Sequence, residues 1–166
     1  MPEATPFEKL QPCLLDRLTD DDPQNTQESR SQRVISVGRY KRGVLRDLEW
    51  LLNASAHLPD EGGGRWRLED YPEAFRSVIN FGTRQLSGLF APDMQELEQR
   101  LTEALELFEP RIIPHSVSIH ASMDRNVIGI EIRGELWANP VPEQLFVKTN
   151  IDIETGLCQL GDSTDG

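Results

Sequence analysis

Residues 94–121 read MQELEQRLTEALELFEPRIIPHSVSIHA, and the spacing of apolar residues in this stretch changes at Pro114. Before that proline, apolar residues recur every three or four positions, which is the period of a helix with one buried face. They are Met94, Leu97, Leu101, Ala104, Leu105 and Phe108. After it, Val117, Ile119 and Ala121 alternate with polar residues, as in a half-buried strand. The stretch therefore predicts a helix that begins after Pro92-Asp93 and leads directly into a sheet.

Two more alternating stretches follow toward the C-terminus. Residues 124–126 are the expected turn of a hairpin whose second strand covers about 127–137. Residues 139–142 contain two prolines and end that strand, and alternation resumes over 145–153 as a third strand. Because helical periods come first and strand periods last, we predict an α+β fold. N-terminal helices should pack on a C-terminal, mainly antiparallel sheet of three to four strands.

Two helical patterns precede residue 94. Residues 39–53 carry a continuous apolar stripe at a helical period. Its members are Val44, Leu45, Leu48, Leu51 and Leu52. A shorter helix is predicted from about Tyr71-Pro72 to Gly82, since proline is tolerated in a first helical turn. We expect one side of that helix to carry its apolar residues. These are Phe75, Val78 and Ile79.

The first 32 residues form a separate unit in this interpretation. Leucines recur at near-helical spacing over 7–18 although Pro12 interrupts them, which indicates a short docking helix. Residues 20–32 have almost no apolar side chain and should be an exposed acidic linker. We therefore divide the chain into a docking helix with its linker (1–32), one folded domain (33–157) and a flexible tail (158–166).

Charge and composition limit the possible partners. The chain has 28 acidic and 17 basic residues among 166, a formal charge of −11, so nucleic acid is not an expected partner. Six basic residues and no acid lie between Arg30 and Arg46, which gives either a solvated helix face or a dock for an acidic surface. No apolar run is long enough to span a membrane, and the first residues resemble no secretion signal. We expect a cytoplasmic protein whose partners are other proteins.

Residue patterns typical of catalysis or metal binding are missing from the sequence. The histidines do not pair at helical spacing, and Cys13 and Cys158 have no close partner. Acidic pairs are common, but 28 acids would produce them by chance. We therefore predict no catalytic residue, no metal site and no cofactor, and both cysteines reduced.

The segment between the last helix and the first strand is different. Glu109 and Arg111 stand two residues apart across Pro110, whose ring fixes the local turn. The two charged groups can then be held for a charge-assisted pair or for a partner contact. The alternative is an ordinary helix end with two solvated charges.

Several stretches together resemble the TssE family, the small baseplate wedge subunits of bacterial type VI secretion systems. This family is related to a wedge protein of contractile phage tails once called lysozyme-like. The matching stretches are Leu14 to Leu18 (LLDRL), Val44 to Asn53 (VLRDLEWLLN), Tyr71-Pro72-Glu73 with Ser77 to Gly82 (SVINFG), and Phe108 to Pro114 (FEPRIIP). They occur in the family's order.

The resemblance implies a structural role in the cytoplasm, at a baseplate docked to the inner membrane. Partners would be the baseplate subunits TssF, TssG and TssK and the sheath subunits TssB and TssC. The Glu-Pro-Arg signature falls on Glu109, Pro110 and Arg111, and the docking helix would contribute Leu14, Leu15 and Arg17. A strand edge within residues 145–153, including Leu145 and Val147, would accept sheath strands by main-chain hydrogen bonding.

Two other functions remain open at this point. One is a cytosolic anti-adaptor of the same fold family, which would bind a response regulator instead of baseplate proteins. The other is a peptidoglycan hydrolase, although no acid/base arrangement in the sequence supports it. Co-purification distinguishes the first from a baseplate subunit, and a cell-wall turbidity assay tests the second.

Overall fold

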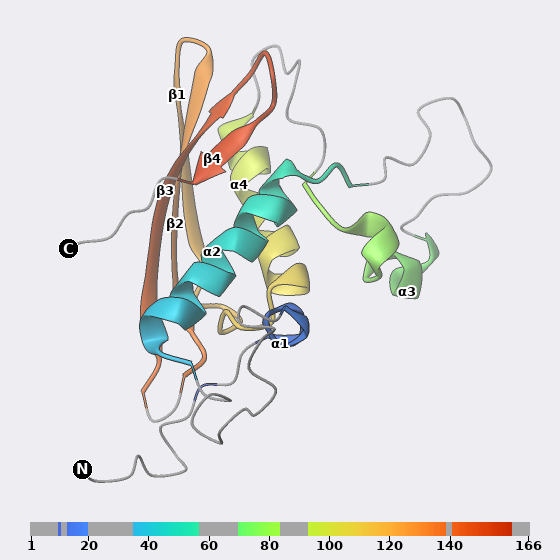
Figure 1. The fold of residues 1–166 in the computed structure, drawn as a ribbon. Helices are drawn as coiled ribbons and strands as arrows, with labels where there is room; N and C mark the ends of the chain where they lie inside the picture. The colour runs from blue at the N-terminus through green and yellow to red at the C-terminus, as the bar shows by residue number, and fades with distance from the viewer. Residues whose placement is uncertain are drawn as a thin grey trace, which may run out of the picture.

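The computed structural model describes residues 10, 13–19, 35–56, 70–83, 93–138 and 141–160. It has two layers, a four-stranded sheet and two long helices that cover one of its faces (Figure 1). The predicted α+β fold, with helices first and sheet last, is confirmed. The acidic linker expected at 20–32 lies outside the described residues.

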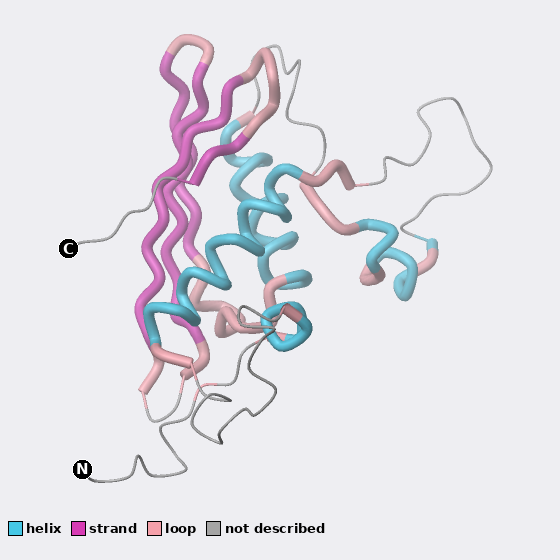
Figure 2. Tube along the Cα trace, viewed as in Figure 1, coloured by secondary structure: helices cyan, strands magenta, loops and turns pink. Residues whose placement is uncertain are grey.

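The sheet is a meander with strand order β1-β2-β3-β4 (Figure 2). Its strands are β1 (Ser118–Asp124), β2 (Val127–Leu136), β3 (Glu143–Asp152) and β4 (Cys158–Leu160), each antiparallel to the next. The register pairs Ile130 with Ala121 on one side and with Thr149 on the other. Buried and exposed residues alternate along β2 and β3, so the helices cover one face and the other faces solvent.

The fourth strand corrects the start of the flexible tail expected at 158–166, because Cys158–Leu160 belong to the sheet, and the remainder of that tail lies outside the described residues. Three residues are too few to show a strand period. Gly156, at a φ of 70°, turns the chain back toward β3, a conformation that glycine adopts without strain. Cys158 is buried, and burial raises the pKa of its thiol, which lies 3.0 Å from the Thr149 hydroxyl.

Both outer strands are tied to a helix by a side chain. The Ala121 N–H of β1 donates to the Glu98 carboxylate at 2.8 Å. The Cys158 N–H and C=O of β4 both bond the Asn53 amide, at 2.9 and 2.8 Å. Such contacts cover main-chain groups that would otherwise pair with another strand.

The two long helices are α2 (Val37–Asn53) and α4 (Met94–Phe108), and both supply the predicted apolar stripe. Ser36 and Asp93 cap their first turns by accepting backbone N–H groups. The stripes and the inner face of the sheet form one core. Its most buried members are Val44, Leu48, Leu51, Leu101, Leu105, Ile128, Ile130, Ile132, Leu136, Val147 and Ile151. Within the described ranges, no helix combines the length and apolarity needed to cross a membrane.

The single helix predicted over about 71–82 is wrong. The chain forms one short turn, α3 (Pro72–Phe75), and then a 3-10 helix, η4 (Val78–Asn80). Ser77 between them is extended, at a ψ of 170°, and its hydroxyl accepts the Ile79 N–H. A side chain that caps a new turn competes with continuation of the old one. The predicted apolar side is therefore not buried, and Val78 is 85% exposed.

The docking helix is shorter than expected, and its leucines face solvent. Helix α1 (Leu14–Leu18) buries none of its residues. Leu14 and Leu18 are 69% and 75% exposed. Upstream, Leu10 is buried and its carbonyl accepts the Ile35 N–H at 3.0 Å. The rest of the predicted helix, at residues 7–9 and 11–12, lies outside the described residues.

Candidate functional site

The Glu-Pro-Arg corner (Glu109, Pro110 and Arg111) joins the end of α4 to the sheet. Glu109 is the C-cap of α4, and its N–H donates to the Leu105 carbonyl at 2.9 Å. The Arg111 carbonyl accepts the Trp137 N–H at 2.7 Å, just past the end of β2. The backbone of the corner is thus fixed at both ends, as Pro110 and its rigid φ predict.

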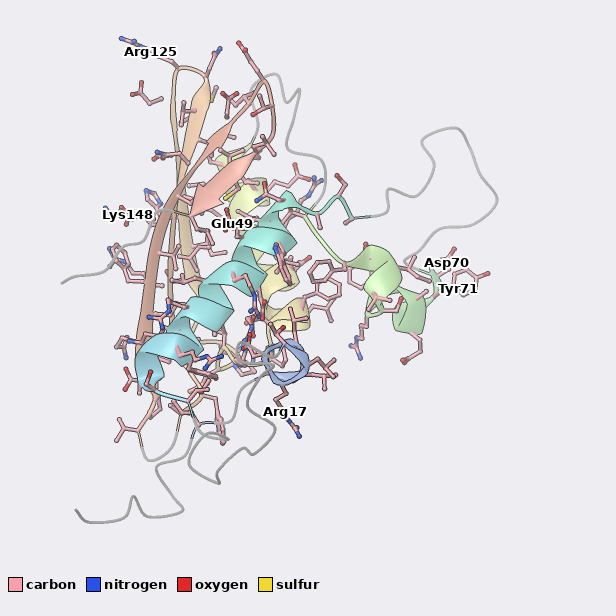
Figure 3. All side chains as sticks on the ribbon, viewed as in Figure 1. Arg17, Glu49, Asp70, Tyr71, Arg125 and Lys148 are labelled. Carbon is pink, nitrogen blue, oxygen red and sulfur yellow. The ribbon has the colours of Figure 1, made fainter. Side chains whose placement is uncertain are left out.

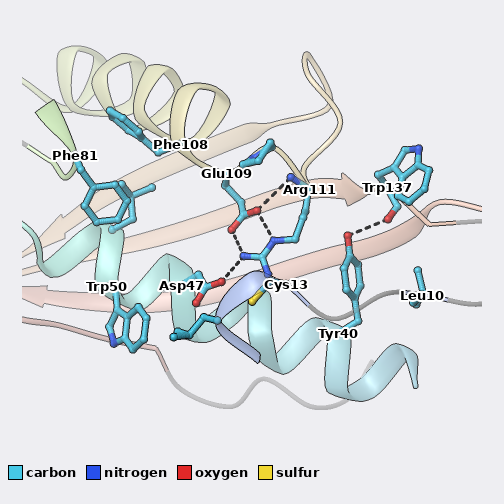
Figure 4. Close-up of a pocket in the computed structure, with 13 residues that line it drawn as sticks. Leu10, Cys13, Tyr40, Asp47, Trp50, Phe81, Phe108, Glu109, Arg111 and Trp137 are labelled. Atoms are coloured by element: carbon cyan, nitrogen blue, oxygen red, sulfur yellow. Dashed lines mark hydrogen bonds and ion pairs between the residues drawn. The ribbon is translucent and has the colours of Figure 1, made fainter. Parts of the chain in front are cut away.

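Glu109 and Arg111 pair with each other inside the protein. The Arg111 guanidinium donates hydrogen bonds to both carboxylate oxygens of Glu109, from Nε to Oε1 at 2.6 Å and from Nη2 to Oε2 (Figure 4). The Arg111 backbone N–H also donates to Oε1, at 3.2 Å. Only 4% of the Glu109 side chain is exposed. Of the alternatives that the sequence left open, the structure shows the charge-assisted pair.

The pair extends into a row of alternating charges that reaches α1. Arg111 Nη2 lies 2.6 Å from Asp47 Oδ2 on α2. The other oxygen of Asp47 lies 2.9 Å from Arg46 Nε, and Arg46 Nη1 lies 2.6 Å from Asp16 Oδ1 on α1. We call these five side chains, Glu109, Arg111, Asp47, Arg46 and Asp16, the ion-pair chain. Three carboxylates and two guanidiniums give it one net negative charge.

The ion-pair chain shifts the acidity of its members. Burial alone would raise the pKa of Asp16, but hydrogen bonds from Arg46 and Cys13 outweigh it and lower the pKa. The pKa of Arg46 is raised, chiefly by its hydrogen bond to Asp16. Burial would lower the pKa of Arg111, yet the contacts with Glu109 and Asp47 raise it. All three groups are therefore charged at neutral pH.

A glycine allows α1 to lie close to α2. A Cβ atom on Gly43 would lie 3.2 Å from Asp16 Oδ2 and 3.8 Å from an Arg111 nitrogen. Cys13 begins α1 as its N-cap, and its thiol donates to Asp16 Oδ2 at 3.1 Å. The contact of α1 with the rest of the domain is thus mainly polar.

A cavity of about 790 Å³ opens beside the ion-pair chain. Most of its lining is apolar and aromatic (Figure 4). The lining residues are Leu10, Cys13, Leu15, Tyr40, Asp47, Trp50, Leu51, Phe81, Phe108, Glu109, Pro110, Arg111 and Trp137. Phe81 and Phe108 meet edge to face with centroids 5.5 Å apart, and Arg46 stacks over Trp50 at 5.1 Å. A cavity with apolar walls and a charged border is suited to the side chains of a partner protein.

The structure brings together only some of the residues predicted as partner contacts. Leu15 lines the cavity with the corner, whereas Leu14 is exposed outside it. Arg17 points into solvent (Figure 3). Leu145 and Val147 lie in the core, so their side chains are not available to a partner. Contact at that strand is left to its backbone and to exposed neighbours such as Gln144 and Lys148.

Sequence reasoning missed Asp16, Arg46, Asp47 and Trp50. Arg111 and Asp47 are 64 residues apart, and no local spacing signals their contact. In the part of the chain that the structure describes, no group of three or more His, Cys, Asp or Glu residues is placed to hold a metal ion. The carboxylates of Glu109 and Asp47 are both engaged by the Arg111 guanidinium.

The domain thus carries a rigid charged corner beside a cavity with aromatic walls. Residues 39–141 match the family described as baseplate wedge protein gp25. The match covers more than half of the sequence, and the chain belongs to this family of structural baseplate proteins. No curated protein matches the chain. The resemblance to wedge subunits that the sequence motifs suggested is thus confirmed.

Proposed function

We propose that this protein is a structural wedge subunit of a type VI secretion baseplate and has no catalytic activity. In this proposal it acts in the cytoplasm, at a baseplate docked to the inner membrane. It joins TssF, TssG and TssK there and helps to start the sheath of TssB and TssC. The observation that carries the proposal is that the Glu-Pro-Arg corner lies inside the region that matches the wedge family.

The surface around α1 supports a contact with other wedge proteins. Leu14 and Leu18 are exposed on α1, and Leu15 and Trp50 line the cavity beside them. Exposed apolar side chains bordering a cavity are typical of an interface. The polar side of α1 holds the helix on α2 through Asp16, which leaves the leucines available to a partner.

Leu14→Asp should reduce co-purification with TssF and TssG by about tenfold or more, because it puts a charge into an apolar contact. The fold should be unaffected, since Leu14 is exposed. Met123→Asp is the matched control, because Met123 is also exposed but lies near the tip of the β1–β2 hairpin, away from α1. Equal recovery of TssF and TssG with wild type and Leu14→Asp would refute this contact.

The register of the sheet indicates where a sheath strand could add. The N–H and C=O of Cys158 bond Asn53, so Ile151 and Cys158 form a pair without main-chain hydrogen bonds between them. Because hydrogen-bonded and non-hydrogen-bonded pairs alternate along an antiparallel ladder, the next pair, Asn150 and Gln159, is hydrogen-bonded. The N–H groups of Gln144 and Lys148 point the same way as that of Asn150, away from β2. Among the described residues, β4 pairs with Thr149–Ile151, and β3 continues beyond it to Glu143. We propose this part of β3 as the acceptor of sheath strands.

Lys148→Pro should block sheath formation in living cells and leave the domain folded. Proline removes an outward-facing N–H and obstructs an added strand, while the bonds between β2 and β3 remain. Lys148→Ala is the control, because it also loses the 2.6 Å ion pair with Glu131 but keeps the N–H. The measurement is imaging of a fluorescent sheath subunit in a deletion strain complemented with each variant. Equal sheath numbers in both variants would contradict strand addition here, and sheaths that persist in the deletion strain would contradict the baseplate role itself.

A further inference from the structure

Helix α1 is attached to the domain by few contacts, and most of them pass through one carboxylate. None of its five residues is buried, and all three of its leucines are exposed. Asp16 accepts hydrogen bonds from Arg46 on α2 and from the Cys13 thiol at the start of α1. The position of α1 therefore depends on the orientation of the Arg46 guanidinium that bonds Asp16.

Arg46 is in turn positioned by the corner. Its Nε and Nη2 bond one oxygen of Asp47, at 2.9 and 2.8 Å, while the other oxygen of Asp47 bonds Arg111. Arg111 is held by the buried Glu109. Asp47 thus lies between two guanidiniums, and each guanidinium bonds a different oxygen of its carboxylate. Loss of one contact frees the Asp47 side chain to move and so weakens the other contact.

We propose that the ion-pair chain couples the docking of α1 to the state of the Glu-Pro-Arg corner, with Asp47 as the positioning residue between them. An intact corner keeps Arg46 aimed at Asp16 and α1 docked, and a corner whose Asp47–Arg111 contact is broken releases α1. Because coupling between two sites is reciprocal, docking of α1 also stabilises the corner. Within the proposed baseplate role, a partner that engages the corner would change how α1 presents its leucines.

The coupling can be measured on the isolated protein through its two cysteines. Cys13 is half-buried at the start of α1 and becomes accessible when α1 leaves α2, whereas Cys158 is buried in the sheet. The rate at which iodoacetamide modifies Cys13 then reports the population of undocked α1, and the rate at Cys158 reports opening of the whole domain. Mass spectrometry distinguishes the two sites.

Asp47→Asn should raise the Cys13 modification rate about tenfold, the size usual for coupled sites, with the Cys158 rate unchanged. Asp47 is not itself bonded to α1 in the described part of the chain, so a merely local role would leave Cys13 unaffected. Asp16→Asn should raise the Cys13 rate directly, and adding Asp47→Asn to it should have little further effect. Glu96→Gln is the matched control, since Glu96 pairs with Arg100 on the exposed side of α4 and should change neither rate.

Arg111→Lys provides a second route in case Asp47→Asn opens the whole domain and both cysteines react. A lysine retains the positive charge beside Glu109 but cannot hydrogen-bond Glu109 and Asp47 at the same time, so the modification rate of Cys13 should again rise. A folded variant of either kind with a wild-type Cys13 rate would overturn the coupling, as would fully additive effects of Asp16→Asn and Asp47→Asn. No partner protein is present in this experiment, so its failure would leave the proposed baseplate role standing.

Discussion

Replacing Arg111 with methionine should lower the free energy of unfolding by about 3 kcal/mol. The Glu109 carboxylate would stay buried without the guanidinium that now contacts both of its oxygens, and Asp47 would lose one of its two partners. A charge left unpaired away from water costs far more than an exposed one. Fluorescence-monitored urea unfolding measures the change, and Trp50 lies in the cavity beside the corner.

Two further variants separate the loss of the pair from the loss of packing. Glu109→Gln combined with Arg111→Met removes both charges and should recover at least half of the lost stability. Arg133→Met makes the same substitution in an exposed pair with Glu131 on the open face of the sheet, and it should cost less than about 1 kcal/mol. An Arg111→Met protein as stable as Arg133→Met would show that the corner contributes nothing to the fold and that its charges serve a partner alone.

A buried corner pair also changes how variants of this motif should be interpreted in cells. A mutation of Glu109 or Arg111 that abolishes sheath assembly does not by itself show a partner contact, because it also weakens the domain. Variants at exposed positions, such as Leu14 on α1 or Lys148 on β3, test contacts without that effect. For this reason the tests of the proposed function use those positions.

The sequence predicted the parts of the fold that depend on a repeated local pattern. Helix α4 and strands β2 and β3 have enough residues to show a clear period of apolar side chains, and the structure places them where expected. Strand β4 has three residues, too few for a period, and it is held by contacts with Asn53, more than 100 positions earlier in the sequence. The prediction of one helix over about 71–82 was wrong for a local reason, because Ser77 caps a new turn and divides the segment into α3 and η4.

The candidate site was predicted only in part, for a related reason. Pro110 between two opposite charges indicated a rigid corner, and the corner is there. The acid that completes it, Asp47, comes from a helix whose apolar stripe shows which face is buried but not what its polar residues meet. The leucines of α1 predicted a docking helix with contacts to a partner, but their spacing did not indicate that Asp16 holds the helix on α2. Hydrophobic spacing indicates that a face will be covered but not whether this chain or a partner covers it.

Leu101→Ala should lower the free energy of unfolding by about 2–5 kcal/mol, through lost burial and the cavity that remains. Leu101 is 1% exposed and lies in the middle of α4, where it belongs to the core between the helix and the sheet. Leu14→Ala is the control, because the same atoms are removed from an exposed leucine and the cost should stay near zero. Urea unfolding measures both variants.

Leu101→Ala and Arg111→Met should both destabilise the domain but should differ in their effect on α1. Leu101→Ala weakens the whole domain but leaves every member of the ion-pair chain in place, so Cys158 should become more reactive while Cys13, which reacts through undocking of α1, should change much less. Arg111→Met removes a member of the chain, so Cys13 should become clearly more reactive than it does in Leu101→Ala. Equal factors in both variants would mean that α1 leaves only when the domain unfolds. A larger factor at Cys13 in Arg111→Met alone would show that the corner controls α1 separately from global stability.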